Sequence, residues 1–366
     1  MSISSLQICL QLTLQLFSVM IHFISNMFKP NYNLTPKLLK NITKIERLYG
    51  QLESKHIPIK LELNLERDNI IQSSYISNSI EGNPLSLQEV TNLLLDDRIS
   101  VNRDEREVKN YFNLLQNLKN FASKEISIKI IKVIHKNLLT GVKDQITGQI
   151  RNKKVIIGEY IKEQKETTLK VKHEPPFHNK CEIKKNIEQL NAWLKKENEL
   201  PITIKAGIYH HQFVYLHPFI DGNGRVCRLL TALIFLQNNY LINKYFVLDD
   251  YYDIDRIMYS DMLHTADKGN KTQWLEYFTD GVKYSLQGAF SKVESALLKL
   301  KIEKRPTPKE KEVLNIVQER KEVVSTEIAE ILNVSRQQAH GLLKALVNKG
   351  FLNRKGKTKK SYYYLK

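Results

Sequence analysis

The chain has 366 residues, of which 42% are hydrophobic and 26% are charged. This balance is typical of a folded globular protein and excludes a collagen-like or wholly disordered chain. Lys and Arg outnumber Asp and Glu by 17, so an anionic partner is expected. More than half of the excess lies in residues 301–366, where 16 Lys and Arg residues accompany 7 Asp and Glu residues. We therefore expect a strongly basic C-terminal segment attached to a larger part of the chain with a smaller net positive charge.

The first 28 residues form an apolar extension without a single Asp, Glu, Lys or Arg. A signal peptide should begin with a basic region, and a membrane span should not carry Gln7, Gln11 and Gln15 along its length. A third interpretation is a translation start placed too early, with the true start at Met27. The sequence leaves these three interpretations open, namely a false or disordered extension, a membrane anchor and an export signal.

The patterns from residue 29 to 300 are mostly helical, with apolar residues three and four positions apart. Residues 29–120 are predicted to form an N-terminal helical region and 121–300 a core with the helices that follow it. Short strands are expected at 154–157 and 168–171, around a polar turn. Further helices are predicted over 127–139, 183–196, 202–214, 226–237, 253–266 and 272–300.

A linker at 305–308 precedes a predicted C-terminal domain, residues 305–366. Its helices are expected at about 308–318, 325–332 and 336–348, followed by a hairpin of 351–355 and 361–365. Ser335 and Gln338 form a capping box, and Gly350 is placed to end the last helix. This order is typical of a winged helix. The predicted fold class is thus all-α with a small β-hairpin, plus a C-terminal winged helix-turn-helix domain.

The cysteines, Cys9, Cys181 and Cys227, form no CxxC pair, and no HExxH is present. The sequence therefore suggests neither a disulfide framework nor a zinc site, and favours reduced thiols and a cytoplasmic location.

Residues 217–225 read His-Pro-Phe-Ile-Asp-Gly-Asn-Gly-Arg and precede an apolar helix. Gly222 and Gly224 allow backbone N–H groups to converge, and the helix N-terminus favours an anion. Arg225 and Arg228 add two cationic groups, Asp221 is a hard oxygen ligand for Mg²⁺, and His217 is a general base. A turn with a helix cap is the simpler alternative, but it does not explain this set of residue types.

This segment matches the signature HPFx(D/E)GN(G/K)R of the Fic family without a departure, and Arg228 falls where that family has its second arginine. The resemblance extends over about residues 30–300. It implies an enzyme that transfers AMP from ATP to a hydroxyl side chain (Ser, Thr or Tyr) of a target protein, itself included. It implies His217 as the base, Asp221 as the Mg²⁺ ligand, and a phosphate site of Gly222, Asn223, Gly224, Arg225 and Arg228.

Three further segments resemble parts of that family. Val155, Ile156, Ile157 and Gly158 resemble its flap, which covers the nucleotide and docks the target; without the resemblance they would be an ordinary strand. Tyr259 and Asp267 fall in the stretch that lines its adenine pocket, although Tyr259 could equally be core. His210 corresponds to a recurring histidine for which a packed structural role is expected, and His211 has no assigned role.

Residues 77–82, Ser-Asn-Ser-Ile-Glu-Gly, are similar to the family's inhibitory motif. Ser77 and Glu81 share one face of a helix, and Gly82 follows them. A glutamate at this place can pair with Arg228 and remove the partner of the γ-phosphate. An exposed helical glutamate followed by a glycine cap is the alternative. The resemblance predicts an autoinhibited enzyme that substitution of Glu81 by glycine would release.

In the predicted winged helix, the recognition helix would begin at Ser335. The candidates for DNA contact are Arg336, Gln337, His340, Arg354, Lys355 and Lys357. Such domains also dock proteins or dimerise, so a homodimer is a further option; a membrane is not expected as a partner.

The leading hypothesis is an autoinhibited protein adenylyltransferase that uses ATP and Mg²⁺. Two alternatives remain. One is a nucleotide-sensing, DNA-binding regulator, for which a general base such as His217 would be unnecessary. The other is an AMP-removing hydrolase on the same fold, for which Glu81 would be required rather than inhibitory.

Overall fold

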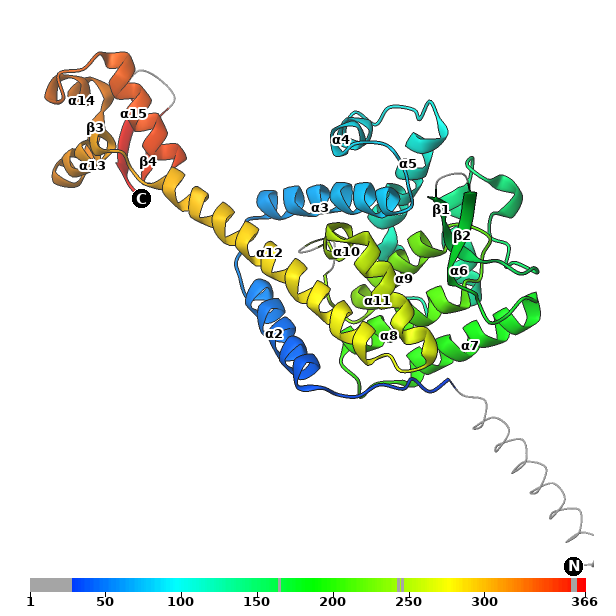
Figure 1. Cartoon of the computed structure of the whole chain (residues 1–366). Coiled ribbons are helices and arrows are strands. Elements are labelled where there is room, and N and C mark those ends of the chain that lie inside the picture. The colour runs from blue at the N-terminus through cyan, green and yellow to red at the C-terminus, as the bar shows by residue number, and fades with distance from the viewer. Residues whose placement is uncertain (1–27, 164–165, 242–243, 245–246, 357–360) are drawn as a thin grey trace, which may run out of the picture. The chain divides into compact units, whose positions relative to one another are not determined.

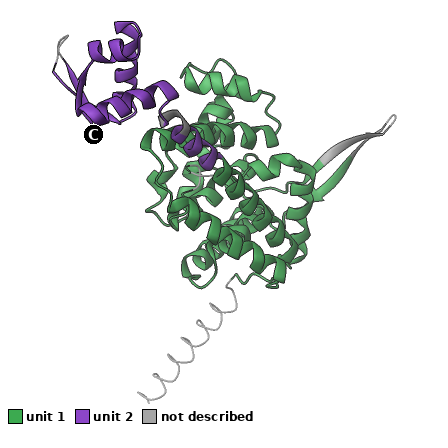
Figure 2. Cartoon of the chain, turned by 90° about the vertical axis from the view of Figure 1, so that its left-hand side faces the viewer, with its two compact units in different colours: residues 1–291 green, residues 292–366 purple. Residues whose placement is uncertain are grey.

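A computed structural model describes residues 28–366 with the exception of 164–165, 242–243, 245–246 and 357–360 (Figure 1). The three interpretations of the apolar extension concern residues that, apart from Phe28, lie outside the described part. Among the described residues, none of the helices has the length and apolar character needed to cross a bilayer. The chain divides into two compact units, residues 1–291 and 292–366 (Figure 2).

The first unit is a helical assembly with one β-hairpin. Its helices up to the hairpin are α2 (Pro36–Glu53), α3 (Ile59–Ile80), α4 (Leu87–Leu95), α5 (Arg103–Gln116) and α6 (Ile128–Leu139), with the short helices η1 (Leu118–Phe121) and η2 (Asp144–Ile146). The hairpin strands are β1 (Ile157–Glu163) and β2 (Glu166–His173). After them come α7 (Lys180–Lys196), α8 (Ile202–Leu216), α9 (Asn223–Gln237), α10 (Asp250–Ile254), α11 (Arg256–Thr265), η3 (Ala266–Lys268) and α12 (Thr272–Lys304), which continues into the second unit.

Helix α9 is the centre of this unit. Every residue of this helix from Arg225 to Phe235 is buried; its polar members are Arg225 and Arg228 in the first turns and Thr231, and the others are apolar except for Cys227. It packs against α3, α5, α6 and α8, so the loop at its N-terminus lies where these helices meet.

Two sequence predictions in this unit need correction. Of the segment 154–157, only Ile157 belongs to a strand; β1 begins there and pairs antiparallel with β2, with an irregularity between Ile157 and Gly158. The helix expected over 253–266 is two helices, because Asp255 adopts an extended conformation and its side chain accepts the Met258 N–H to start α11. The hairpin extends away from the helical body (Figure 2).

The second unit contains α13 (Pro308–Arg320), β3 (Glu322–Val324), α14 (Ser325–Ile331), α15 (Arg336–Asn348), β4 (Leu352–Lys355) and β5 (Tyr362–Leu365). Its antiparallel sheet has the order β3-β5-β4. The helices and the hairpin agree with the expected positions, including the capping box of Ser335 and Gln338 and a left-handed Gly350, whereas β3 was not predicted. Within the expected linker, Thr307 forms the N-cap of α13.

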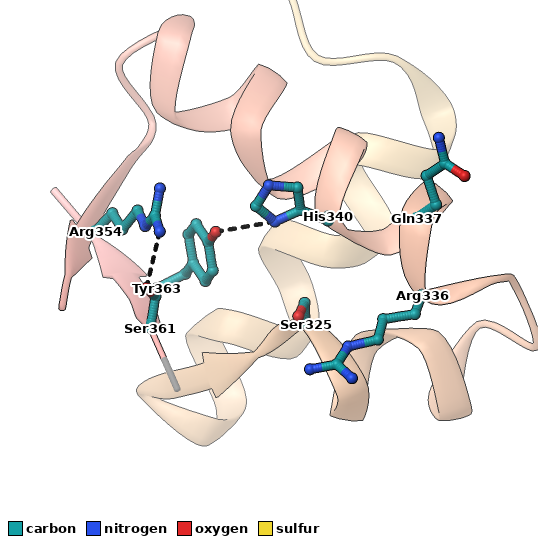
Figure 3. Close-up of a pocket in the computed structure, with 7 residues that line it drawn as sticks. All are labelled: Ser325, Arg336, Gln337, His340, Arg354, Ser361 and Tyr363. Carbon is teal, nitrogen blue, oxygen red and sulfur yellow. Dashed lines mark hydrogen bonds between the residues drawn. The ribbon is translucent and has the colours of Figure 1, made fainter. Parts of the chain in front are cut away.

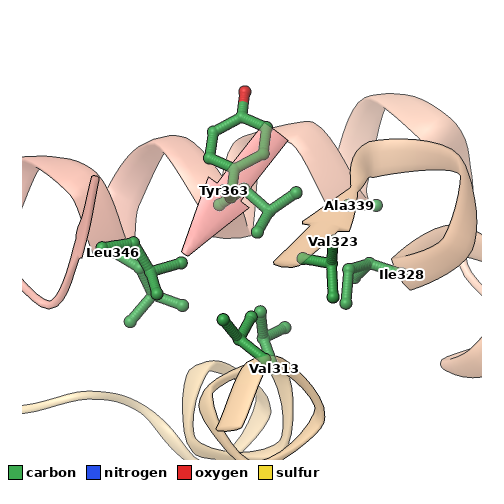
Figure 4. Packing of buried hydrophobic residues seen from close by; sticks show 9 residues of the cluster. Val313, Val323, Ile328, Ala339, Leu346 and Tyr363 are labelled. Carbon is green, nitrogen blue, oxygen red and sulfur yellow. The ribbon is translucent and has the colours of Figure 1, made fainter. Parts of the chain in front are cut away.

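This unit has a hydrophobic core of its own, to which all six elements contribute (Figure 4). Val313 lies on α13, Val323 on β3, Ile328 on α14, Leu346 on α15 and Tyr363 on β5, each at most 2% exposed. Leu352 supplies the contribution of β4. A closed core of this kind is what a small separate domain requires.

Candidate functional site

The site begins with the turn between α8 and α9. His217 ends α8 in a left-handed conformation, with φ of 46°, and Gly222 precedes α9 with φ of 77°. A non-glycine residue in this region is strained and is kept there only by its surroundings. The turn therefore presents the His217 side chain and the first N–H groups of α9 from one short, fixed segment.

Arg151, which the sequence analysis did not single out, stabilises this turn through hydrogen bonds to its carbonyl oxygens. Its guanidinium is buried and donates to the carbonyl oxygens of Leu216 (3.2 Å), His217 (2.6 Å) and Lys153 (2.8 Å). Its backbone N–H also bonds the Pro218 carbonyl. One planar cation thus satisfies the last carbonyls of α8, which have no intrahelical partners, and fixes the residue that carries the imidazole.

The His217 imidazole is enclosed, and its Nδ1 has no hydrogen-bond partner among the described residues. Burial lowers the pKa of His217 to about 4, and the nearby His173 adds to the shift. The ring is therefore neutral at physiological pH. A neutral imidazole is able to accept a proton, as a general base requires.

The side chains of Asn223 and His135 form hydrogen bonds that stabilise the turn. The Asn223 amide bonds both the N–H and the carbonyl of Phe219, each at 2.9 Å. His135 accepts the Gly148 N–H on Nδ1, so its Nε2 carries the hydrogen and donates to the Asp221 carbonyl at 3.0 Å. The His135 ring also stacks on Phe219, with 3.7 Å between centroids. Sequence reasoning did not single out His135.

The Asp221 carboxylate lies at the rim, about a quarter exposed. Its Oδ2 contacts the Lys143 ammonium and its Oδ1 accepts the Gly222 N–H at 2.7 Å. Burial by itself would raise the pKa of Asp221. The positive charges of Lys143 and Arg225 nevertheless hold this pKa below its ordinary value. The group is an ionised oxygen ligand at neutral pH.

The two arginines of the motif have different partners. Arg228 donates to the Ser77 side chain (2.6 Å), to the Ser77 carbonyl (2.9 Å) and to Glu81 Oε1 (2.7 Å). Arg225 instead pairs with Glu107 at 2.9 Å and Asn78 at 3.3 Å, with its side chain 3% exposed. Of the two, Arg228 alone lines the cavity described next.

A cavity of about 330 Å³ lies in front of His217. It is lined by Ile80, Glu81, Ile157, Gly158, Lys172, His173, Val214, His217, Gly224, Arg228, Arg256, Ile257, Tyr259, Ser260, Leu263 and His264. Its Lys and Arg side chains outnumber the single carboxylate, Glu81. The lining therefore favours an anionic ligand with an apolar portion.

Some of the residues expected in the flap and the adenine pocket line this cavity, and others do not. Ile157 and Gly158 line the cavity, whereas Val155 and Ile156 precede the strand and are outside its lining. Tyr259 lines the cavity, and its hydroxyl forms a hydrogen bond of 2.9 Å with His210 Nε2. Asp267 is not part of the lining.

Asp267 is instead surrounded by histidines. Its carboxylate contacts His173 Nδ1 (2.8 Å), His211 Nε2 (2.9 Å) and His264 Nδ1 (2.9 Å). Burial by itself would raise the pKa of Asp267, but these three contacts hold that pKa far below its usual range. The sequence does not reveal this cluster, because its members come from β2, α8, α11 and η3.

His210 is buried and bonds Thr231 and Tyr259, both at 2.9 Å, in keeping with the structural role expected of it.

In the second unit, four of the DNA-contact candidates line one pocket of about 550 Å³ (Figure 3). Arg336, Gln337 and His340 reach it from α15 and Arg354 from β4, and Ser325, Ser361 and Tyr363 complete the lining. Arg354 donates to Ser361 at 3.0 Å, and the Tyr363 hydroxyl lies 3.3 Å from His340 Nδ1. Lys355 is exposed at the end of β4, and Lys357 lies outside the described residues.

Residues 125–235, which contain the turn, match the Fic/DOC family. The protein adenylyltransferase Fic of Nematostella vectensis is 27% identical over 221 residues, covering 57% of this chain and 47% of that protein. The protein adenylyltransferase fic-1 of Caenorhabditis elegans is 26% identical over 224 residues, covering 58% and 40%. The chain thus spans about half the length of these curated relatives.

Solved structures show the same fold. A Fic family protein from Desulfovibrio desulfuricans G20 superposes with a TM-score of 0.64 at 23% identity, covering 93% of this chain and 98% of that one. Fic-1 (residues 134–508) from C. elegans gives a TM-score of 0.56 at 22% identity, covering 71% and 73%. The family match over residues 125–235 and these two superpositions show that this part of the chain is similar to the Fic/DOC family and that the chain has the fold of these solved proteins.

Proposed function

We propose that this protein transfers AMP from ATP to a hydroxyl side chain of a target protein. The observation that carries the proposal is a neutral His217 in a cation-lined cavity at the N-terminus of α9. In this reaction the target hydroxyl oxygen bonds to the α-phosphorus, and its proton passes to His217. The bond between that phosphorus and the oxygen that bridges to the β-phosphate breaks, and pyrophosphate leaves. The names of the curated relatives support this reaction class.

In this proposal the phosphates bind the first N–H groups of α9, beside Gly222 and Gly224, with Arg228 as their cationic partner. Arg225 acts indirectly, because its guanidinium is engaged by Glu107 and Asn78. It holds α9 against the neighbouring helices. Asn223 likewise shapes the turn through Phe219.

Asp221 is the residue that would hold Mg²⁺. One ionised carboxylate together with substrate phosphates is the usual way in which proteins bind this ion. The rim position and the ionised state of Asp221 fit that chemistry, and Lys143 would have to yield its place at Oδ2. When bound, Mg²⁺ neutralises phosphate charge as the bond to pyrophosphate breaks.

We further propose that Glu81 inhibits the enzyme. Its carboxylate contacts Arg228 and lines the cavity, so it occupies the cation that a γ-phosphate needs. Gly224 faces it so closely that a side chain at this position would collide with the carboxylate. The inhibitory arrangement thus depends on Ser77, Glu81 and Gly224 together.

The test is incubation with Mg²⁺ and ATP that is radiolabelled at either the α- or the γ-phosphate, followed by detection of label on protein. We expect label from the α-phosphate alone, strong in Glu81→Gly and absent in Glu81→Gly/His217→Ala. Label from the γ-phosphate would indicate a kinase instead. Absence of label in every variant, despite measurable ATP binding, would contradict the proposed transfer.

The same variants separate the transferase from an AMP-removing hydrolase. A glutamate that positions a water molecule is needed for hydrolysis, so Glu81→Gly would abolish AMP removal rather than stimulate it. Starting from AMP-modified protein, we expect the wild type to release AMP no faster than Glu81→Gly.

We propose in addition that residues 305–366 are a winged helix that binds duplex DNA. The supporting observation is that Arg336, Gln337, His340 and Arg354 line one pocket between α15 and the hairpin (Figure 3). The first turn of α15 would meet base edges, and Arg354 with Lys355 would contact phosphates.

Fluorescence anisotropy of the full chain with labelled duplex DNA tests this second proposal. We expect affinity to fall steeply with salt, and Arg336→Ala and Arg354→Ala each to weaken binding about tenfold. Arg320→Ala is the matched control, because Arg320 is an exposed arginine of α13 outside the pocket. Equal effects of all three substitutions, or no binding at low salt, would contradict the proposal.

A further inference from the structure

The cluster around Asp267 contains more nitrogen and oxygen ligands than the AMP-transfer proposal uses. His173 is the last residue of β2, His264 lies on α11, and Asp267 lies on η3, which follows α11 directly. One potential ligand atom from each of the three lies within 4.8 Å of the others.

Hydrogen bonds fix the tautomer of His173. Its Nε2 lies 2.9 Å from the Tyr215 carbonyl, an acceptor, so this nitrogen carries a hydrogen. In the neutral ring, Nδ1 then presents a lone pair to Asp267 Oδ2, only 2.8 Å away. In that tautomer the Nδ1 lone pair and the carboxylate oxygen both point to the space between the two residues, where a bound cation would accept them.

The second oxygen of Asp267 is already occupied. Lys271 Nζ donates to His211 Nδ1 at 2.7 Å, which leaves the hydrogen of neutral His211 on Nε2. That Nε2 donates to Asp267 Oδ1 at 2.9 Å. Asp267 Oδ2 therefore faces His173 and His264, while Oδ1 accepts the hydrogen bond from His211. A metal-binding histidine typically donates its other N–H to a carbonyl, and a metal-binding carboxylate is itself hydrogen-bonded.

We propose that His173 Nδ1, His264 Nδ1 and Asp267 Oδ2 form a binding site for a divalent transition-metal ion of the Zn²⁺ class. Ligands at ~2.0 Å in tetrahedral geometry are about 3.3 Å apart, so the two N–O separations of 2.8 and 2.9 Å need only a small expansion. Two imidazoles and one carboxylate favour such an ion over Mg²⁺, which prefers oxygen ligands.

The site would have an open position toward the cavity, because His173 and His264 both line it whereas Asp267 lies behind them. The metal would also tie the end of the β1–β2 hairpin to the turn after α11. The proposal is independent of AMP transfer, since metal content and coordination are measured without any substrate.

The experiment uses the full chain, stripped with a chelator and titrated with Co²⁺, which replaces Zn²⁺ and absorbs visible light when tetrahedral. Wild type is compared with Asp267→Asn and His264→Ala, and with His178→Ala as a matched control. His178 is an exposed histidine five residues beyond His173 and outside the cluster. His264 is the less buried of the two ligand histidines, so its variant is the one that perturbs packing least. Circular dichroism confirms that each variant is folded.

We expect one equivalent of Co²⁺ with tetrahedral absorption in wild type and His178→Ala, displaced by Zn²⁺ and not by Mg²⁺. In both cluster variants the dissociation constant should rise at least about tenfold, since loss of a supporting partner alone costs that much. Substoichiometric binding, or equal binding by His264→Ala and wild type, would overturn the proposal. So would ¹⁵N spectra in which the His173 Nδ1 resonance does not change when one equivalent of Zn²⁺ is added.

Discussion

Glu81 Oε1 lies 2.7 Å from Arg228 Nη2, although 147 residues separate the two in sequence. The same guanidinium bonds the hydroxyl and the carbonyl of Ser77, one turn earlier on α3. Its contacts with α3 therefore leave Arg228, 3% exposed, with little room for an additional anion. Any phosphate that approaches it has to compete with a carboxylate that is already paired.

The first prediction concerns nucleotide affinity. Substitution Glu81→Gly removes the competing carboxylate, so we expect ATP to bind at least about tenfold more tightly, as measured by isothermal titration calorimetry with Mg²⁺. Asp96→Gly is the control, since Asp96 is also an exposed acidic residue that ends a helix, α4. Equal affinities for wild type and Glu81→Gly would show that the contact with Arg228 does not limit binding.

The second prediction concerns the pH dependence of AMP transfer. With a pKa of about 4, His217 stays deprotonated from pH 8 down to pH 5, so kcat/KM of Glu81→Gly should change less than twofold from this group. A histidine with its ordinary pKa near 6.5 would lose about 30-fold over the same range. Initial rates across this range decide between the two, and a steep fall centred near pH 6.5 would refute the lowered pKa.

The third prediction concerns Arg151, whose guanidinium serves the carbonyls of Leu216, His217 and Lys153. Arg151→Ala leaves these acceptors without their donor, so we expect the unfolding free energy to fall by about 3 kcal/mol. We also expect kcat to fall more than KM rises, because His217 loses its support. Arg67→Ala is the control, since Arg67 is half exposed and pairs with its neighbour Asp68. A loss of stability with unchanged kcat would limit Arg151 to a structural role.

The fourth prediction concerns acid stability of the first unit. Burial lowers the pKa of His135 and of His211 to about 4, so the unfolded chain binds more protons than the folded one between pH 6.5 and 4. Stability should therefore be constant above about pH 7 and fall as the pH drops from 6.5 to 4, by up to about 1.4 kcal/mol per pH unit for each such histidine.

Tryptophan fluorescence measures this effect selectively, because both tryptophans of the chain, Trp193 and Trp274, belong to the first unit. Urea midpoints at pH 8, 7, 6 and 5 should be equal for the first pair and decrease thereafter. Midpoints that do not change down to pH 5 would show that these histidines are protonated within the folded protein.

The sequence predicted local features well. Helix α6 has an apolar periodicity that determines which of its faces is buried, and Ser335 with Gln338 forms a cap within four residues. The turn at 217–225 was recognisable because its residues are contiguous. The pairing of Glu81 with Arg228 was anticipated only because each belongs to a motif of the family that the sequence resembles.

Features that depend on residues far apart could not be predicted. Arg151 has no motif of its own, and its role follows from carbonyls more than 60 positions later in the chain. The three residues of β3 are too few for a period, and they become a strand by pairing with β5 at the end of the chain. The pairing of the Arg225 guanidinium with Glu107 spans 118 residues, and the motif alone does not indicate it.

The position of Glu81 at the very end of α3 bears on how the contact with Arg228 could open. The N–H groups of Glu81 and Gly82 bond carbonyls only three residues back, and Gly82 turns away with φ of 88°. Terminal helical turns open at a small free-energy cost, far below that of unfolding the domain. The carboxylate can therefore leave Arg228 by fraying of one turn while Ser77 keeps the rest of α3 in place. Such opening would be seen as fast amide exchange at 81–82 beside protected amides earlier in the helix.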